Sequence, residues 1–133
     1  MDSTSIDLCG SRISRVEVDG DTVKLRFEPA YLVKTMTGSV ERTRWWQNGY
    51  LVFEGATLED PSVMDELPAD CAGGDVGENV FTYRDMLPVP LKSAGHAHCD
   101  LRLKESEHSL RIEAKGLHLE LEGVAKYLEH IRP

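Results

Sequence analysis

The fold of this chain is indicated most clearly by one stretch, Arg15-Val16-Glu17-Val18-Asp19-Gly20-Asp21-Thr22-Val23-Lys24-Leu25-Arg26-Phe27-Glu28. Apolar and polar side chains alternate on both sides of Gly20-Asp21, and this period of two is typical of strands with one buried face. Gly20-Asp21 itself predicts a two-residue hairpin turn. The turn places Val18 opposite Val23, and it pairs acidic with basic side chains on the other face. The register is therefore consistent on both faces.

The same period of two recurs along most of the chain. Asn48-Gly49 is a strong turn signal and predicts a second hairpin. Lys115-Gly116 predicts a turn within a C-terminal antiparallel meander. From Val124 onward the apolar spacing fits a bulged strand or a short helix, and we favour the strand. Further strands are predicted at 30–34, 42–47, 50–54, 80–84, 97–103, 110–114 and 117–121, with a proline-containing edge segment at 87–91.

Strands at hairpin spacing predict a mainly β fold class. We expect an antiparallel β-sandwich or a small barrel of about eight strands, with one short helix at most. The chain has 133 residues, of which 41% are hydrophobic, and this suits a single β-rich domain over 1–133. Between 59 and 79 the periodicity disappears among prolines, glycines and acidic residues. This segment predicts a long acidic loop, with one helical turn near Val63 to Leu67.

Charge and the start of the chain limit the class of function. The formal net charge is −8, and a nucleic-acid partner is not expected because phosphate binding needs a basic surface. No Lys or Arg lies between Trp45 and Tyr83, whereas eight acidic residues do. The start, Met1 to Asp7, lacks the features of a secretory signal, and no stretch is apolar enough to span a membrane. We therefore expect a cytoplasmic protein without a membrane partner.

Three histidines are candidate metal ligands. His96 and His98 lie two residues apart and resemble the His-x-His core of cupin metal sites, but the glutamate and the later histidine of that pattern are missing. The alternation places both on the polar face. A surface site together with His118 requires the two strands to be neighbours. We expect ordinary exposed histidines, no metal site and no cofactor.

The three cysteines show no zinc or disulfide spacing, so they are predicted to be reduced thiols. Cys99 shares the apolar face of its strand, and His98 points away from it, so a buried, unreactive thiol is expected. Cys9 and Cys71 lie in polar contexts and are expected to be accessible. No catalytic residues are assigned, and enzymatic activity has no positive support in the sequence.

The predicted hairpin at Asn48-Gly49 carries consecutive tryptophans, Trp45 and Trp46, which must project to opposite faces. If Trp46 shares the inner face with Leu51, then Trp45 and Tyr50 remain at the surface, although half-buried cross-strand neighbours are the plainer alternative. Exposed aromatic side chains anchor protein partners or stack on sugar rings.

Two segments resemble small bacterial all-β proteins of unknown function, namely Arg15 to Tyr31 and Leu119 to Glu129. The resemblance implies the β fold and brings no catalytic residue. It leaves the acidic segment unmatched.

Our leading hypothesis is a protein-interaction module, adaptor-like or inhibitor-like, that contacts a partner with a basic surface. Its predicted contact residues lie on the aromatic hairpin and in the acidic loop: Trp45, Trp46, Tyr50, Asp70 and Asp75. The alternative is a small-ligand-binding or metal-binding protein of cupin-like or barrel type. A homodimer is compatible with either hypothesis.

Overall fold

The computed structural model describes residues 3–38 and 40–131 of the chain. Met1 and Asp2, the first two residues of the segment that lacks secretory-signal features, lie outside the described residues. The elements in chain order are β1 (Ser3–Asp7), β2 (Arg12–Asp19), β3 (Thr22–Thr35), β4 (Arg42–Glu54), β5 (Thr57–Leu58), the 3-10 helix η1 (Pro61–Glu66), β6 (Ala69–Glu78), β7 (Phe81–Arg84), β8 (Met86–Val89), β9 (Lys92–Ser93), β10 (Ala97–Leu103), β11 (Ser109–Ala114), β12 (Gly116–Leu121) and β13 (Lys126–Ile131).

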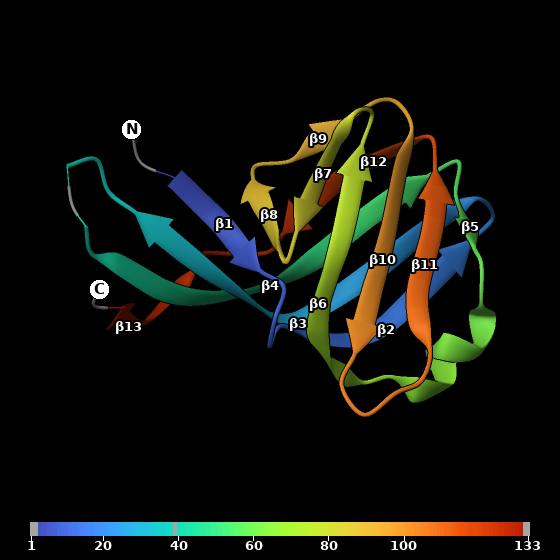
Figure 1. Ribbon diagram of the computed structural model, residues 1–133, viewed down its shortest axis with the longest axis horizontal. Coiled ribbons are helices and arrows are strands. Elements are labelled where there is room, and N and C mark those ends of the chain that lie inside the picture. The colour runs from blue at the N-terminus through green and yellow to red at the C-terminus, as the bar shows by residue number, and fades with distance from the viewer. Residues whose placement is uncertain (1–2, 39, 132–133) are drawn as a thin grey trace.

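All strand pairs are antiparallel, and they form one sheet that folds into two layers (Figure 1). The rear layer has the order β2-β3-β4-β12-β9, and the front layer has the order β5-β11-β10-β6-β7. In the described part of the chain, two residue pairs at the start of β2 and of β6, Arg12 with Asp70 and Ile13 with Ala69, join the layers at one edge. Among the described residues the sheet does not close into a barrel. The predicted mainly β class is confirmed. The structure adds short strands, such as the two-residue β5 and β9, in which an alternation of apolar and polar residues cannot be recognised.

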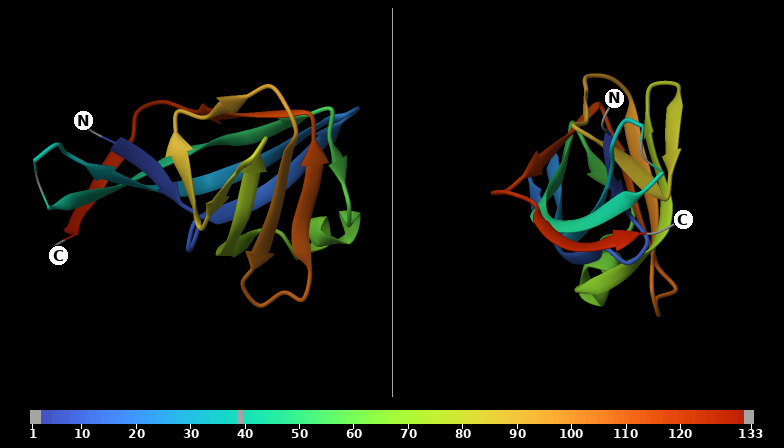
Figure 2. Two further views of the ribbon diagram at one scale, coloured as in Figure 1. Left: turned by 45° about the horizontal axis from the view of Figure 1, so that its top comes forward. Right: turned by 90° about the vertical axis from the view of Figure 1, so that its left-hand side faces the viewer.

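The distal halves of β3 and β4 extend beyond the two layers. We call this extension the arm: residues 30–35 and 42–47, together with β1 on one side and β13 on the other. Figure 2 shows the arm projecting at one end of the molecule, with both chain ends beside it. The predicted edge segment, β8, has β1 as its single pairing partner within the described ranges. The C-terminal segment is a bulged strand, as favoured above.

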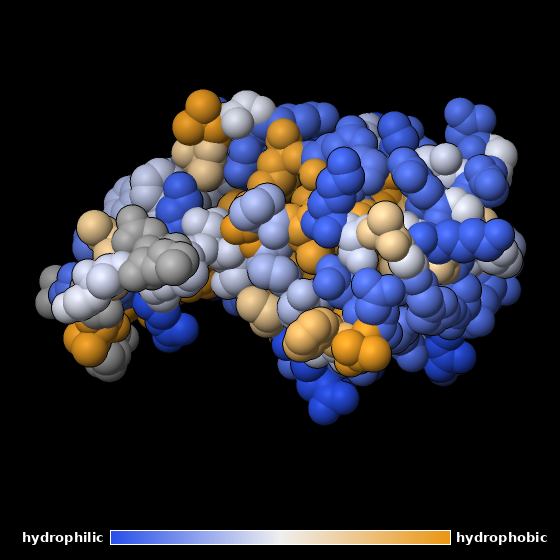
Figure 3. Space-filling view, turned by 90° about the horizontal axis from the view of Figure 1, so that it is seen from above, coloured by the Kyte–Doolittle hydropathy of each residue, from blue (hydrophilic) through white to orange (hydrophobic). Residues whose placement is uncertain are grey.

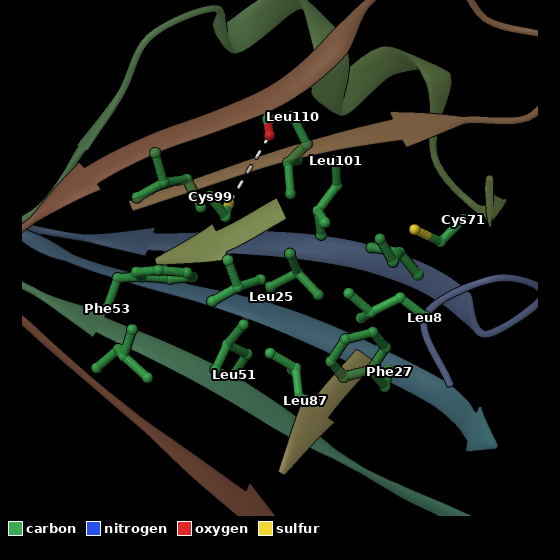
Figure 4. Close-up of a cluster of buried hydrophobic side chains, with 14 of the residues drawn as sticks. Leu8, Leu25, Phe27, Leu51, Phe53, Cys71, Leu87, Cys99, Leu101 and Leu110 are labelled. Carbon is green, nitrogen blue, oxygen red and sulfur yellow. Dashed lines mark hydrogen bonds between the residues drawn. The ribbon is translucent and has the colours of Figure 1, made fainter. Parts of the chain in front are cut away.

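The hydrophobic core lies between the layers. Figure 4 shows Cys99, Leu101 and Leu110 of the front layer facing Leu25, Leu51 and Phe53 of the rear layer. The register of the first hairpin is the predicted one, with Val18 opposite Val23 and Val16 opposite Leu25. The apolar faces of β10 and β11 are likewise buried as predicted. No helix in the described ranges is long and apolar enough to cross a membrane.

The prediction of a hairpin at Asn48-Gly49 is wrong. Strand β4 runs without interruption from Arg42 to Glu54, and the connection to β3 lies beyond the end of the arm. Gly49 serves a different purpose, because β12 passes directly beside it. A Cβ atom at this position would lie 2.5 Å from the carbonyl oxygen of Glu120 and 2.8 Å from the Cα of Leu121. The glycine allows close strand approach and makes no turn.

The prediction of a long loop over 59–79 is also wrong for its second half. Residues 69–78 form β6, between β10 and β7 in the front layer. Its glycines mark close approach, since a Cβ at Gly74 would lie 2.2 Å from the carbonyl oxygen of Asp100 and the ring of His98 covers Gly77. The predicted helical turn is present as η1.

The predicted C-terminal meander is wrong at one connection. Strands β10 and β11 pair as expected, but β12 pairs with β4 and β9 and therefore belongs to the rear layer. Lys115-Gly116 carries the chain from one layer to the other, where Leu117 is buried.

Candidate functional site

The two tryptophans lie on opposite faces of the arm, with the inner and outer roles reversed from the prediction. Because β4 is continuous, Trp45 has the same parity as Leu51 and Phe53 and packs against the core. Its indole Nε1 donates to Thr43 Oγ1 at 2.8 Å, and its ring meets the edge of Tyr127 at a centroid distance of 5.3 Å. Trp46 consequently lies on the outer, solvent-facing side, where it is half-buried.

A bulge in β3 brings a second aromatic ring beside Trp46. The register shifts by one residue between Phe27 and Ala30, so the side chains after the bulge change faces relative to those before it. Leu32 is therefore buried, and Tyr31 joins the outer face directly opposite Trp46. On the other side of Trp46, Lys126 of β13 is the paired residue, and its Nζ lies 4.9 Å from the indole centroid.

Two hollows meet at Trp46. The first has a volume of about 500 Å³ and is lined by Arg12, Glu28, Pro29, Tyr31, Trp46, Asn48 and Leu128. The second has a volume of about 240 Å³ and is lined by Trp46, Gln47, Asn48, Glu122, Gly123, Val124 and Lys126. Because both include Trp46 and Asn48, they form one groove across the outer face of the rear layer. We call it the Trp46 groove.

No family model, curated protein or solved structure matches this chain. The resemblance to small bacterial β-proteins therefore stays a prediction.

The carboxylates that line the Trp46 groove are engaged by neighbouring groups. Arg26 is almost fully buried and donates to both oxygens of Glu122, at 2.7 and 3.0 Å. Ser14 Oγ donates to Glu28 at 2.7 Å, and Arg26 Nε lies 3.3 Å from the same carboxylate. These hydrogen bonds hold the pKa of Glu28 and of Glu122 below the usual range of a glutamate.

Tyr50 does not line the groove and makes polar contacts of its own. Arg15 donates to the Tyr50 hydroxyl at 2.9 Å, and that hydroxyl donates to Glu17 at 3.0 Å. The guanidinium of Arg26 lies 4.6 Å from the ring centroid. The residue is half-buried, as in the plainer alternative, and a partner-binding role for it stays a prediction.

Asp70 and Asp75 lie on β6 in the front layer and do not line the Trp46 groove, although Asp70 is the cross-strand partner of Arg12 at its edge. Asp75 already has a cationic partner, Arg84, at 3.0 Å, and this hydrogen bond lowers the pKa of the aspartate. Asp70 is exposed beside the start of β6. The structure therefore does not unite the five predicted contact residues in one surface. Seen from above, the end of the molecule opposite the arm is covered mainly by hydrophilic side chains (Figure 3).

The histidines do not converge. His98 belongs to β10 in the front layer, whereas His118 belongs to β12 in the rear layer. His96 lies 3.4 Å from Glu113, and His118 lies 2.7 Å from Glu120. Within 3–38 and 40–131, no group of three or more His, Cys, Asp or Glu side chains is placed to hold a metal ion. The condition for a surface site shared by His98 and His118, that their strands are neighbours, is therefore not met.

The cysteines divide into one exposed and two buried thiols. Cys99 is buried as predicted, its thiol donates to the carbonyl oxygen of Leu110 at 3.7 Å, and burial raises its pKa. The prediction of an accessible Cys71 is wrong, because β6 buries it and burial raises its pKa to about 11. Cys9 is exposed, although partial desolvation and the nearby Asp85 raise its pKa.

We expect a thiol reagent to label one cysteine per native chain quickly, and all three cysteines after denaturation. The reason is that Cys71 and Cys99 are buried out of reach of the reagent, whereas Cys9 is exposed. The measurement is the absorbance change with a disulfide reagent under mildly alkaline conditions. The variant Cys9→Ser should abolish the fast phase. Fast labelling of two or three thiols in the folded chain would contradict the burial of β6 and β10.

Of the residues that line the groove, the sequence pointed only to Trp46. Arg12, Tyr31 and Lys126 are far apart in the sequence, and no local motif connects them. The one available signal was Pro29 within a strand pattern, since a proline inside a strand often marks a bulge. A bulge there moves Tyr31 to the face of Trp46.

Proposed function

We propose that this protein is a protein-interaction module that holds an extended segment of a partner in the Trp46 groove. The observation that carries the proposal is the place of Trp46: it is half-buried on a solvent-facing sheet surface, between two hollows, with Tyr31 beside it. Tryptophan and tyrosine are enriched among the residues that dominate binding energy, especially where they line a concave surface. An adaptor-like or inhibitor-like role fits this arrangement.

The arm supports the proposal because it makes the groove rigid. Trp46 and Tyr31 belong to the longest strand pair of the fold, and β13 adds a third strand beside them. A site on paired strands loses little conformational freedom when a ligand binds. The predicted partner with a basic surface remains a separate prediction for Asp70 and Asp75 on the front layer.

Selection from a random peptide library displayed on phage tests the proposal. We expect peptides that bind the wild type, and we expect Trp46→Ala to weaken them by at least roughly 30-fold, which corresponds to the ~2 kcal/mol of a typical hot spot. The affinities are measured by calorimetry with synthetic peptides. The matched control is Trp45→Phe, which alters the tryptophan on the other face and should leave binding unchanged.

A second variant guards against a folding artefact. Leu128 is exposed at the groove edge, so Leu128→Ala should weaken the same peptides less strongly while the fold persists. If the selection yields no binder, or if the binders bind Trp46→Ala as tightly as the wild type, the proposal is wrong.

A second candidate function is the binding of a small ligand with a flat ring, such as a sugar. One observation favours it: Tyr31 and Trp46 are direct cross-strand partners on an outer sheet face, with the amide of Asn48 in the same groove. The metal-dependent form of this alternative has no support in the placement of the histidines. Binding of a glycan that depends on Trp46, together with no binding of peptides that depends on Trp46, would favour this second candidate.

A further inference from the structure

We infer that the partner segment held by the Trp46 groove is acidic, with an apolar side chain placed on Trp46 between two carboxylates. This inference rests on the proposed function and adds the chemistry of the partner. It depends on one difference: two cations that line the groove form no ion pair with the described residues, whereas the carboxylates that line it already receive hydrogen bonds.

The two cations at the ends of the groove have no carboxylate partner in the described part of the chain. Arg12 donates to the main-chain carbonyl of Glu28 at 3.3 Å, and no ion pair is formed by its guanidinium within 3–38 and 40–131. Lys126 lies over Trp46 at 4.9 Å and forms no ion pair with the described residues either. Each can therefore accept a carboxylate from a ligand without losing an internal one.

The carboxylates of the groove, in contrast, already have hydrogen-bond donors within the chain. Glu122 receives two hydrogen bonds from the buried Arg26, and Glu28 receives hydrogen bonds from Ser14 and Arg15. A basic ligand would have to compete with Arg26, which is buried and would be left without part of its compensation. The groove consequently favours a negatively charged ligand, although the whole chain is acidic.

The net charge of −8 does not oppose this inference. The excess of carboxylates lies between Trp45 and Tyr83, chiefly on η1, on β6 and on the segments that flank them. These elements belong to the front layer and to one end of the molecule, whereas the groove lies on the outer face of the rear layer. Asp70 is the exception, since it is the cross-strand partner of Arg12, but the two side chains form no ion pair within 3–38 and 40–131. Charges separated by more than about 8 Å in solution are largely screened at physiological ionic strength.

The alternation of an extended chain sets the spacing of acidic and apolar residues in the segment. Lys126 is paired with Trp46, whereas Arg12 donates to the carbonyl of Glu28, three residues before Tyr31 on β3. Lys126 lines one of the two hollows that meet at Trp46, and Arg12 lines the other. In an extended peptide the first, third and fifth residues point to the same side. The expected pattern is therefore acidic at the first and fifth positions and apolar at the third.

The test compares three synthetic peptides by calorimetry and by the tryptophan indole signals in NMR spectra. Each has the core Glu-Ala-Leu-Ala-Glu, Gln-Ala-Leu-Ala-Gln or Lys-Ala-Leu-Ala-Lys between two glycine pairs, with blocked ends. We expect the glutamate peptide to bind about tenfold more tightly than the glutamine peptide, and we expect no detectable binding of the lysine peptide. Added salt should reduce the advantage of the glutamate peptide.

Charge-neutralising variants locate the effect. Arg12→Gln and Lys126→Gln should each reduce the affinity for the glutamate peptide about threefold, with no change for the glutamine peptide. The matched control is Lys34→Gln, because Lys34 lies over Trp45 at 4.2 Å on the opposite face of the arm. Free glutamate should not compete, since it lacks the apolar anchor.

Equal affinity of the glutamate and glutamine peptides, tighter binding of the lysine peptide, or no binding by any of the three would overturn the inference. The proposed function would survive these outcomes if the library selection still yields peptides that depend on Trp46. It fails with the inference only when the selection also yields none.

Discussion

The variant Gly49→Ala is expected to lower the free energy of unfolding by about 3 kcal/mol, the upper part of the usual range for overpacking. The added methyl group would lie 2.5 Å from the carbonyl oxygen of Glu120 and 2.8 Å from the Cα of Leu121, and both of these atoms belong to the backbone of β12. Backbone atoms cannot rotate away as a flexible side chain does. The clash can be relieved only if β12 moves away from β4.

Chemical denaturation of the wild type and the variant measures this effect. The matched control is Gly116→Ala, because Gly116 is also a buried strand glycine but its added Cβ would meet its nearest neighbour, the carbonyl oxygen of Ser93, at 3.2 Å. A shift of a few tenths of an ångström relieves that contact, so we expect the control to lose no more than about 1 kcal/mol. A loss at Gly49 as small as that at Gly116 would contradict the close pairing of β4 with β12 at this residue.

The variant Phe53→Ala is expected to have the larger effect on stability, a loss of about 4 kcal/mol. Phe53 is fully buried in β4, and its ring lies on the side of the rear layer that faces Cys99 (Figure 4). Truncation removes the contacts of the ring and leaves a cavity between the two layers. The paired strands of each layer resist moving into that cavity. The surrounding side chains cannot fill that cavity completely.

The control for this prediction is Phe81→Ala. Phe81 lies on the short strand β7 and is 64% exposed, so its loss should change the free energy of unfolding by no more than about 0.5 kcal/mol. Both variants are compared by urea denaturation with a common slope. Equal losses at the two positions would contradict the placement of the core between the layers.

The parts of the fold that the sequence predicts correctly depend on local alternation. The turn at Gly20-Asp21 fixes the register of β2 and β3, and the apolar faces of β10 and β11 follow from the period of two alone. In both cases the neighbouring residues in the sequence contain the whole signal. The favoured strand assignment of the C-terminal segment is also confirmed, although its apolar spacing fits a short helix as well.

The errors at Asn48-Gly49 and over residues 69–78 share one physical cause. Asn48-Gly49 and the glycines of residues 73–77 were interpreted as marks of turns and loops, whereas the structure uses Gly49, Gly74 and Gly77 where another strand or a histidine ring passes within contact distance. A missing Cβ permits both uses, and a single sequence does not distinguish them. The error at Asn48-Gly49 reversed the faces of Trp45 and Trp46.

The groove itself was beyond sequence reasoning because it is built from distant segments. Arg12 lies at the start of β2, Tyr31 follows a bulge in β3, and Lys126 belongs to the last strand. Their meeting depends on strand order, and strand order is set by pairing between distant segments. The sequence does predict Trp46 as a contact residue, because consecutive tryptophans on a strand must face opposite ways. That rule holds for any strand order.

The most direct test of the central claim, that the Trp46 groove is the docking surface, is the ¹H–¹⁵N spectrum of the two indole groups during titration with a selected peptide. The indole N–H of Trp45 is held by Thr43 on the core side of the arm, so it serves as an internal reference. We predict that the Trp46 signal shifts with saturation while the Trp45 signal stays in place. Equal shifts of both signals, or a shift of Trp45 alone, would contradict the account.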